Sequence, residues 1–392
     1  MQRIGVLGGT FDPIHLGHIL LAKQALAQAQ LDLVLFVPMA RPSHRKPEAD
    51  IAHRLEMCRL ALMNEKGVAL SEAGIQGSVR YTADTLPYLR KEYPDARFSL
   101  ILGADKLPSL PYWHEADRLF AVCDVLCYPR PGVATDETLE RAREMGVRAR
   151  LLPGDALPYS STLIRDLTAQ YADAPGLHPD VLCHMAENGL YQPDFLPRLK
   201  HMMNPRRFRH TLGVRKEAVR LSRIHGLPIQ KAALAGLLHD CAKGMPVPVM
   251  AKIARENGLM ADPALLSSGA MMHGPVGAHV AREQFGVRDE AVLDAIRNHT
   301  VGRPGMSPLE MCIFVADATE ENREDYEGLK EIRALSDDSL AAAAARSLQL
   351  TEEYLEKSGR PFYSVSRQTL DWLLQSLTPA ESARLTSIRR SR

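Results

Sequence analysis

Gly8-Gly9-Thr10-Phe11-Asp12-Pro13-Ile14-His15-Leu16-Gly17-His18 follows the short apolar run Ile4-Gly5-Val6-Leu7 near the start of the chain. A buried strand that breaks into a glycine turn and then begins a helix brings backbone N–H groups close to a phosphate. His15 and His18 lie three residues apart at the expected start of that helix, so both can face one point above the end of the strand. The stretch therefore predicts a site that holds a polyphosphate.

Length and composition narrow the classes of protein that this chain can be. A chain of 392 residues exceeds what one hydrophobic core normally serves, so we expect two domains. The formal net charge of +1 gives no electrostatic argument for nucleic acid or a membrane surface as a partner. Six scattered cysteines without a CxxC pair indicate reduced thiols. We expect neither a signal peptide nor a membrane span, and therefore a cytoplasmic enzyme.

Short apolar segments alternate with helical patterns through the first half of the chain. The expected strands are rich in branched or aromatic residues and lie at 3–7, 33–37, 98–102 and 122–128. Apolar residues with helical spacing lie at 19–30, 51–64 and 81–93. This alternation predicts a parallel sheet of Rossmann type, with a ligand above the carboxyl ends of the strands.

Polar residues gather in the loops after these strands. The loop 38–47 is rigid and cationic, although a simple solvated turn would have the same composition. In segment 80–86, threonine hydroxyls and free N–H groups at a helix start suit a carboxylate, which we place near Thr85. Ser161 and Thr162 begin a helix whose N-terminus favours anions, and Arg165 lies in its first turn.

These motifs resemble the nucleotidylyltransferase superfamily, and residues 8–18 look most like those of bacterial nicotinate mononucleotide adenylyltransferase. The resemblance extends to about residue 191. It implies transfer of AMP from ATP, accompanied by Mg²⁺, to nicotinate mononucleotide, with deamido-NAD and pyrophosphate as products. Transfer to another acceptor, such as nicotinamide mononucleotide or pantetheine phosphate, stays open.

The resemblance also implies the residues of this first site. We expect ATP to be bound by Gly8, Gly9, Thr10, Phe11, His15, His18, Gly103, Asp105, Ser161, Thr162 and Arg165. His15, His18 and Arg165 are the expected catalytic residues among them. We expect nicotinate mononucleotide to be bound by His44, Arg45, Lys46, Thr85 and Trp113. Which cation of the loop replaces the family's usual lysine stays open, and a tryptophan is otherwise most often a core residue.

The pattern changes between residues 192 and 205, where prolines and basic residues interrupt the periodicity. We therefore expect a first domain over 1–195, a linker over 196–205 and a second domain over 206–392. The second domain has helical spacing almost throughout, at 208–225, 229–243, 248–258, 277–285, 289–298, 308–318 and 329–357. An all-α domain is the expected fold.

An ordered series of histidines and aspartates runs through this second domain. Its members are His210, His239, Asp240, His273, His299 and Asp317. Six imidazole and carboxylate ligands exceed one tetrahedral centre, so two metals bridged by Asp240 are expected. Mixed nitrogen and oxygen ligation suits iron, with manganese as the alternative. His279 is the main rival of His273, and we favour His273.

The series resembles the HD-domain metallophosphohydrolases, most closely the YqeK-like branch, over residues 206 to about 371. That resemblance implies symmetrical hydrolysis of diadenosine tetraphosphate to two ADP, with Asp240 as a catalytic residue. Lys243 and Arg303 could neutralise the polyphosphate, whereas the Arg206-Arg207 pair reads as solvated charge. Hydrolysis of another nucleotide, or a non-catalytic nucleotide sensor, stays open.

The sequence thus predicts a bifunctional cytoplasmic enzyme. Its expected partners are the small molecules ATP, nicotinate mononucleotide and diadenosine tetraphosphate, without nucleic acid or membrane. A homo-oligomer is left open.

Overall fold

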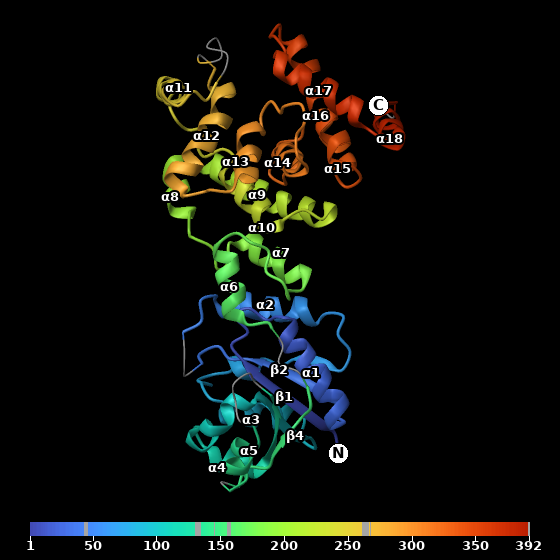
Figure 1. The fold of residues 1–392 in the computed structure, drawn as a ribbon. Helices are drawn as coiled ribbons and strands as arrows, with labels where there is room; N and C mark the ends of the chain where they lie inside the picture. The colour runs from blue at the N-terminus through green and yellow to red at the C-terminus, as the bar shows by residue number, and fades with distance from the viewer. Residues whose placement is uncertain are drawn as a thin grey trace. The chain divides into compact units, whose positions relative to one another are not determined.

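The computed structural model describes residues 1–42, 46–129, 135–144, 146–154, 158–260, 266 and 268–390. The chain forms two compact units (Figure 1). The first comprises Met1–Ala169 and Ala174–His184, and the second comprises Gln170–Asp173 and Met185–Arg392.

A parallel sheet of six strands forms the centre of the first unit, in the order β3-β2-β1-β4-β5-β6. Its strands are β1 (Arg3–Gly9), β2 (Leu33–Pro38), β3 (Val68–Leu70), β4 (Arg97–Gly103), β5 (Cys123–Tyr128) and β6 (Ala149–Leu151). Val6 of β1 pairs with Leu35 of β2 and with Leu100 of β4. In chain order, β2 and β3 lie on one side of β1, and β4, β5 and β6 lie on the other side. A ligand crevice is therefore expected beyond the carboxyl ends of β1 and β4.

Helices cover both faces of this sheet (Figure 1). They are α1 (Leu16–Ala29), α2 (Ile51–Leu62), η1 (Glu72–Ile75), α3 (Thr82–Glu92), η2 (Ala104–Tyr112), α4 (Ala116–Val122), α5 (Thr135–Glu144) and α6 (Ser161–Ala169), where η1 and η2 are 3₁₀ helices. One face of the sheet buries Ile4, Val6 and Leu35 against Leu86 and Leu89 of α3. The parallel α/β fold expected from the sequence is confirmed.

The second unit is helical. After α7 (Pro179–Asn188), which begins in the first unit, come α8 (Leu196–Met202), α9 (Pro205–His225), α10 (Ile229–Leu238), α11 (Val247–Glu256), α12 (Gly269–Phe285), α13 (Glu290–Asn298), α14 (Pro308–Thr319), α15 (Leu329–Ser336), α16 (Leu340–Lys357), α17 (Ser364–Ser376) and α18 (Pro379–Arg390). Its core includes Val214, Leu238 and Ile313, all fully buried. The expected all-α fold is confirmed.

Several segments differ from the sequence prediction, among them three in the second unit. Residues 196–205 contain α8 rather than only a linker, because Leu199 is fully buried in the second core. The helix expected at 277–285 begins eight residues earlier, at Gly269. The single helix expected at 329–357 is two helices, because Ser339 accepts a hydrogen bond from the Ala342 N–H and caps a new helix there.

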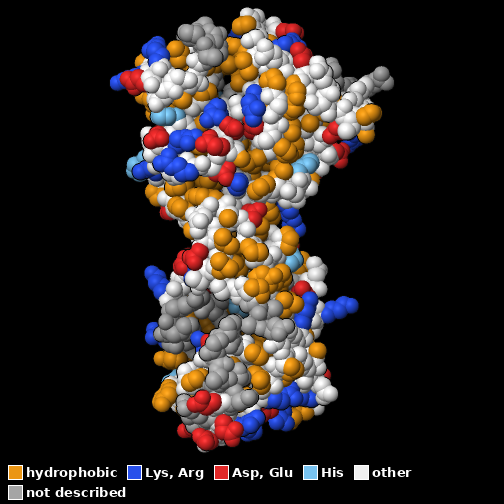
Figure 2. All heavy atoms as spheres, in the orientation of Figure 1, with side chains coloured by type: hydrophobic (Ala, Val, Ile, Leu, Met, Phe, Trp, Pro, Cys, Tyr) orange, Lys and Arg blue, Asp and Glu red, His pale blue; other side chains and the backbone are white. Residues whose placement is uncertain are grey.

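All six cysteines are buried and free, as expected. Across the described residues, no helix is long and apolar enough to cross a membrane. Basic and acidic side chains lie interspersed on the face drawn in Figure 2, in keeping with the formal net charge of +1.

Candidate active sites

A cavity of about 710 Å³ lies at the carboxyl end of the sheet in the first unit. Its lining includes Leu100, Ile101 and Leu102 of β4, and it therefore lies where the crossover pattern predicts a ligand. Many of the residues expected at the ATP site share this cavity. They are Gly8, Gly9, Thr10, Phe11, His18, Asp105 and Ser161, and Trp113 from the other expected subsite lines it as well.

His15 and His18 lie together at the start of α1. Their ring centroids are 3.8 Å apart, and the His15 N–H donates to His18 Nδ1 over 3.2 Å. In neutral His18 the hydrogen therefore sits on Nε2, which can donate to a phosphate. A Cβ on Gly17 would lie 2.8 Å from His15 Nδ1, so only glycine leaves room for the His15 ring here. His15 is buried and is not among the described residues that line the cavity.

A buried arginine, whose role the sequence did not predict, joins two of the loops that line the cavity. Arg54 of α2 is 1% exposed. Its guanidinium donates to the carbonyls of Thr10 and Met39, each over 2.8 Å, and to those of Ala49 and Ala40 over 3.1 and 3.2 Å. Thr10 follows β1 and Met39 follows β2, and both line the cavity. Arg54 thus fixes the relative position of two loops that carry binding groups.

The start of α6 is attached to the same loop. Ser161 Oγ donates to the Pro13 carbonyl over 2.9 Å, and Arg165 Nη1 donates to the Asp12 carbonyl over 2.8 Å. Arg165 Nε also lies 2.5 Å from Glu48 Oε1. The guanidinium of Arg165 therefore faces Asp12 and Glu48, and Arg165 does not appear in the described lining of the cavity.

The start of α3 corrects the expected position of the carboxylate. Thr85 is 1% exposed and its hydroxyl donates to the Thr82 carbonyl, so Thr85 does not reach the cavity. Arg80, Tyr81 and Thr82, which precede it, line the cavity instead. Tyr81 stacks on the ring of His114 with centroids 4.4 Å apart. The part of α3 that faces the cavity is therefore its start, at Thr82.

Of the remaining residues predicted for this site, one lines the cavity, three do not, and two lie outside the described residues. Trp113 lines the cavity, and its Nε1 donates to Ser109 Oγ over 3.2 Å. Gly103 is buried at the end of β4, and Thr162 and Lys46 are exposed. None of these three is among the described lining residues. His44 and Arg45 lie outside the described residues.

The second unit brings all six predicted metal ligands together, and three of them, His239, His273 and His299, lie next to Asp240. His273 Nε2 and His299 Nε2 lie 3.4 and 3.6 Å from Asp240 Oδ1, and His239 Nε2 lies 3.7 Å from Asp240 Oδ2. All four side chains are at most 1% exposed. The sequence left His273 and His279 as alternatives for one of these positions, and His273 is the one that lies beside Asp240.

The histidine tautomers indicate that a cation belongs here. The Nδ1 atoms of His239, His273 and His299 face the backbone carbonyls of Gly236, Gly269 and Ile296 at 2.7, 3.3 and 2.7 Å, so each Nδ1 must donate. Each Nε2 of a neutral ring then carries a lone pair. Burial lowers the pKa of His239 to about 4 and that of His273 to about 3, which keeps both rings neutral.

These lone pairs point at one another and at carboxylates. His273 Nε2 and His299 Nε2 are only 3.0 Å apart, and the Thr300 hydroxyl beside them can donate to just one. Within the described part of the chain, the buried His239 Nε2 has no hydrogen-bond partner. Histidines held through Nδ1 with Nε2 bare are typical of metal ligands. The donor set therefore fits metal ions.

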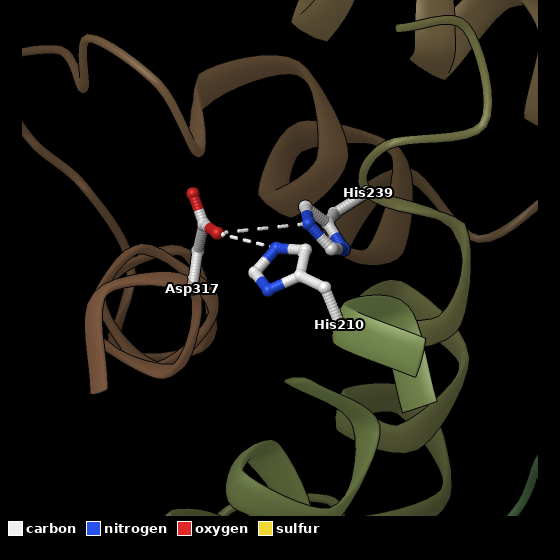
Figure 3. Close-up of side chains that lie close together, drawn as sticks. All are labelled: His210, His239 and Asp317. Atoms are coloured by element: carbon white, nitrogen blue, oxygen red, sulfur yellow. Dashed lines mark ion pairs between the residues drawn. The ribbon is translucent and has the colours of Figure 1, made fainter. Parts of the chain in front are cut away.

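His210, His239 and Asp317 form the other half of the cluster (Figure 3). Asp317 Oδ1 lies 3.0 Å from His210 Nε2 and 3.8 Å from His239 Nε2. His210 Nδ1 lies 3.0 Å from the buried carboxylate of Glu320. Burial alone would lower the pKa of His210, but the two carboxylates raise it to about 9. Glu320 was not foreseen, and it holds His210 as the backbone carbonyls hold the other ligands.

Cationic side chains surround the cluster. Arg207 Nη1 lies 2.9 Å from Asp240 Oδ2, Lys243 Nζ lies 3.3 Å from Asp240 Oδ1, and Arg323 Nη2 lies 2.6 Å from Asp317 Oδ1. Burial raises the pKa of Asp240, but the neighbouring imidazoles of His239 and His299 and the ammonium of Lys243 hold it well below its usual range. The reading of Arg207 as solvated charge is therefore wrong, whereas Arg206 pairs with Glu324 in exposed positions.

Arg303 does not reach the cluster. Its guanidinium makes two 2.8 Å hydrogen bonds to the buried carboxylate of Glu310, which also accepts from the Ser307 N–H at the start of α14. The polyphosphate contact expected for Arg303 is therefore not supported, and arginines that do contact the cluster are Arg207 and Arg323. Together with Lys243, Arg207 and Asp240, Arg323 lines a cavity of about 790 Å³, here called the charged cavity.

Two protein families match the chain in the same order as its two units. The Cytidylyltransferase-like family matches residues 6–167, and the HD domain matches residues 207–322. A protein of Mycoplasma pneumoniae named "Probable nicotinate-nucleotide adenylyltransferase/Ap4A hydrolase" is 30% identical over 328 residues, which are 83% of this chain and 91% of the relative. The chain belongs to the nicotinate-nucleotide adenylyltransferase/Ap4A hydrolase family.

Two shorter relatives resemble one part of the chain each. A "Probable nicotinate-nucleotide adenylyltransferase" of Bordetella avium is 41% identical over 199 residues, covering 49% of this chain and all of the relative. A "Bis(5'-nucleosyl)-tetraphosphatase, symmetrical" of Bacillus subtilis is 38% identical over 177 residues, covering 45% of this chain and 94% of the relative. Both resemblances stated from the sequence are confirmed.

Proposed function

We propose that this chain transfers AMP from ATP to nicotinate mononucleotide in its first unit and hydrolyses diadenosine tetraphosphate to two ADP in its second. The observation that supports the first activity best is the single cavity that joins the glycine loop, His18, Ser161 and Trp113. The second activity rests on the buried cluster around Asp240, whose bare imidazole nitrogens suit metal ions.

Adenylyl transfer requires alignment more than an activated nucleophile. The phosphate of nicotinate mononucleotide attacks the α-phosphorus of ATP, the bond to the β-phosphate oxygen breaks, and pyrophosphate leaves. Because the nucleophile already carries its charge, the protein has to position two anions and stabilise charge between them. The loop at Gly9 and Thr10 and the Nε2 hydrogen of His18 can supply donors there. Mg²⁺ bound with ATP would neutralise part of the triphosphate charge.

The other end of the cavity suits the nicotinate ring and its carboxylate. Trp113 offers an aromatic face, and the first turn of α3 offers the N–H groups of a helix start beside Arg80. Arg80 adds a positive charge that suits a carboxylate better than the neutral carboxamide of nicotinamide mononucleotide. Nicotinate mononucleotide is therefore the acceptor that this lining fits best.

Hydrolysis in the second unit depends on residues that hold metals and residues that hold phosphate. His210, His239, Asp240, His273, His299 and Asp317 would hold two divalent ions, for which we propose iron, with manganese as the alternative. Such ions supply a nucleophile from water at neutral pH and a clamp for a phosphate. Arg207, Lys243 and Arg323 would bind the negative charge of the substrate's phosphates. Burial lowers the pKa of His239 and His273, which keeps both rings neutral for metal binding.

Two assays test this proposal. Full-length protein should form deamido-NAD from ATP and nicotinate mononucleotide faster than it forms NAD from nicotinamide mononucleotide. Metal-loaded protein should release ADP, and not AMP with ATP, from diadenosine tetraphosphate. Absence of deamido-NAD would refute the first activity, and binding of diadenosine tetraphosphate without turnover would favour a sensor over a hydrolase. A cytoplasmic location is proposed from the buried free thiols.

A further inference from the structure

A second cavity opens onto the metal-binding cluster, beside α16. It has a volume of about 500 Å³, and His299 and Asp317 of the cluster form part of its wall. We call it the α16 cavity. It shares Lys243, Arg323 and Tyr326 with the charged cavity. Two cavities therefore border the cluster, and they share two cationic side chains.

The walls of the two cavities differ in chemistry. The charged cavity is lined by Arg206, Arg207 and Arg209 in addition to the shared cations, and these groups suit phosphates. The α16 cavity has an apolar and aromatic part, formed by Phe314, Ile332, Leu350 and Tyr354. Its remaining wall is polar, and includes the hydroxyls of Ser347 and Thr351 and the charged Glu327, Glu353 and Lys357. A wall with both apolar and polar parts suits a planar base carrying a hydroxylated sugar.

The aromatic residues of the α16 cavity are held at its edge. Tyr326 Oη donates to the Ala318 carbonyl over 3.0 Å, which fixes its ring between the two cavities. The loop that carries it lies close against α16, because a Cβ on Gly328 would lie 2.5 Å from Leu350 Cδ1. Gly328 also has φ +91°, which other residues rarely adopt. Tyr354 is 61% exposed, and Arg360 Cζ lies 5.2 Å from its ring centroid over one face, so the other face is the one that a ligand can contact.

We propose that the α16 cavity binds one adenine nucleoside of the dinucleotide, with the polyphosphate passing Lys243 and Arg323 towards the charged cavity. The inference rests on the proposed hydrolase activity and names the substrate's position within it. It assigns nucleoside recognition to α16, which lies outside residues 207–322 that match the HD domain. With one base held in the α16 cavity, the position of this cavity beside the cluster would decide which phosphate bond is cleaved. Recognition of the second base would then not be needed.

The test compares variants of the metal-loaded full-length protein in hydrolysis of diadenosine tetraphosphate. Tyr354→Ala removes an exposed aromatic ring, and Thr351→Arg fills the α16 cavity from an exposed helix position. Leu374→Ala is the control, because Leu374 is also exposed and is not in the described lining of either cavity. The readouts are KM and the inhibition constants of ADP and inorganic pyrophosphate against the same reaction.

Both cavity variants should raise KM and the inhibition constant of ADP about 5- to 100-fold, the range expected when a base loses an aromatic partner. The inhibition constant of pyrophosphate should change less than about twofold, because pyrophosphate has no base. Unchanged KM in Tyr354→Ala and Thr351→Arg, or an equal rise for ADP and pyrophosphate, would overturn the assignment. Wild-type protein that releases no ADP would instead refute the hydrolase, and the nucleoside site with it.

Discussion

Replacing the buried Arg54 with methionine is expected to disable adenylyl transfer while leaving hydrolysis in the second unit intact. Arg54 joins the loop at Thr10 to the loop at Met39 through its guanidinium. Methionine is unbranched, reaches about as far as Nε of Arg54 and has no hydrogen-bond donor. The substitution therefore removes the hydrogen bonds between these two loops while retaining much of the packing.

The size of the effect follows from the hydrogen bonds that are lost. Four carbonyls accept from Arg54, at 2.8 to 3.2 Å. A hydrogen bond to a charged group contributes about 1.5–3 kcal/mol, and a buried group left unpaired costs about 1–3 kcal/mol. Because neighbouring bonds are not additive, we expect a loss of about 4 kcal/mol in the free energy of unfolding. A displacement of about 1 Å between the loops should lower kcat/KM by about 100-fold.

The assay measures deamido-NAD formation from ATP and nicotinate mononucleotide, below the unfolding temperature of each variant. Hydrolysis of diadenosine tetraphosphate in the same preparation reports whether the second unit is intact. Arg54→Lys keeps the charge and three donors, so it should recover part of the lost activity. Wild-type kcat/KM in Arg54→Met would show that the loops need no such anchor and would refute the reasoning.

Three further outcomes are expected. Glu320→Gln should weaken metal binding by about 10- to 100-fold in titrations of metal-stripped protein, whereas exposed Glu321→Gln should not. Arg323→Ala should raise KM for diadenosine tetraphosphate about tenfold, whereas Arg303→Ala should lower only the unfolding temperature. Burial raises the pKa of Asp124, but its two arginine partners lower it more, so its stabilising effect exists above about pH 4 and is lost on further acidification. Asp124→Asn should therefore flatten the fall in unfolding temperature between about pH 5 and 3.

The sequence predicted the central strands of the sheet because they are apolar and buried on both faces. It missed β3 and β6, which have three residues each and carry no measurable periodicity. It also joined α15 and α16, although Ser339 is a typical helix cap. That signal could have separated the two helices.

Metal ligands were predictable because imidazoles and carboxylates in a fixed order have few other uses. The groups that support the two sites were not, since Glu320 and Arg54 have ordinary sequence surroundings and acquire roles only through contacts distant in the chain. The same reason explains why the sequence pointed to Arg303 instead of Arg323 as the arginine beside the cluster. Both follow metal ligands in sequence, and only the fold shows that Glu310 binds the first.

We propose that one chain carries two active sites, one in each unit. The most direct test measures both reactions in the full-length variants His18→Ala and Asp240→Ala. His18→Ala should lose about 100-fold in deamido-NAD formation and keep hydrolysis of diadenosine tetraphosphate within about twofold, and Asp240→Ala should do the reverse. If Asp240→Ala still releases ADP at the wild-type rate, or if His18→Ala still forms deamido-NAD at that rate, the corresponding site has been assigned wrongly.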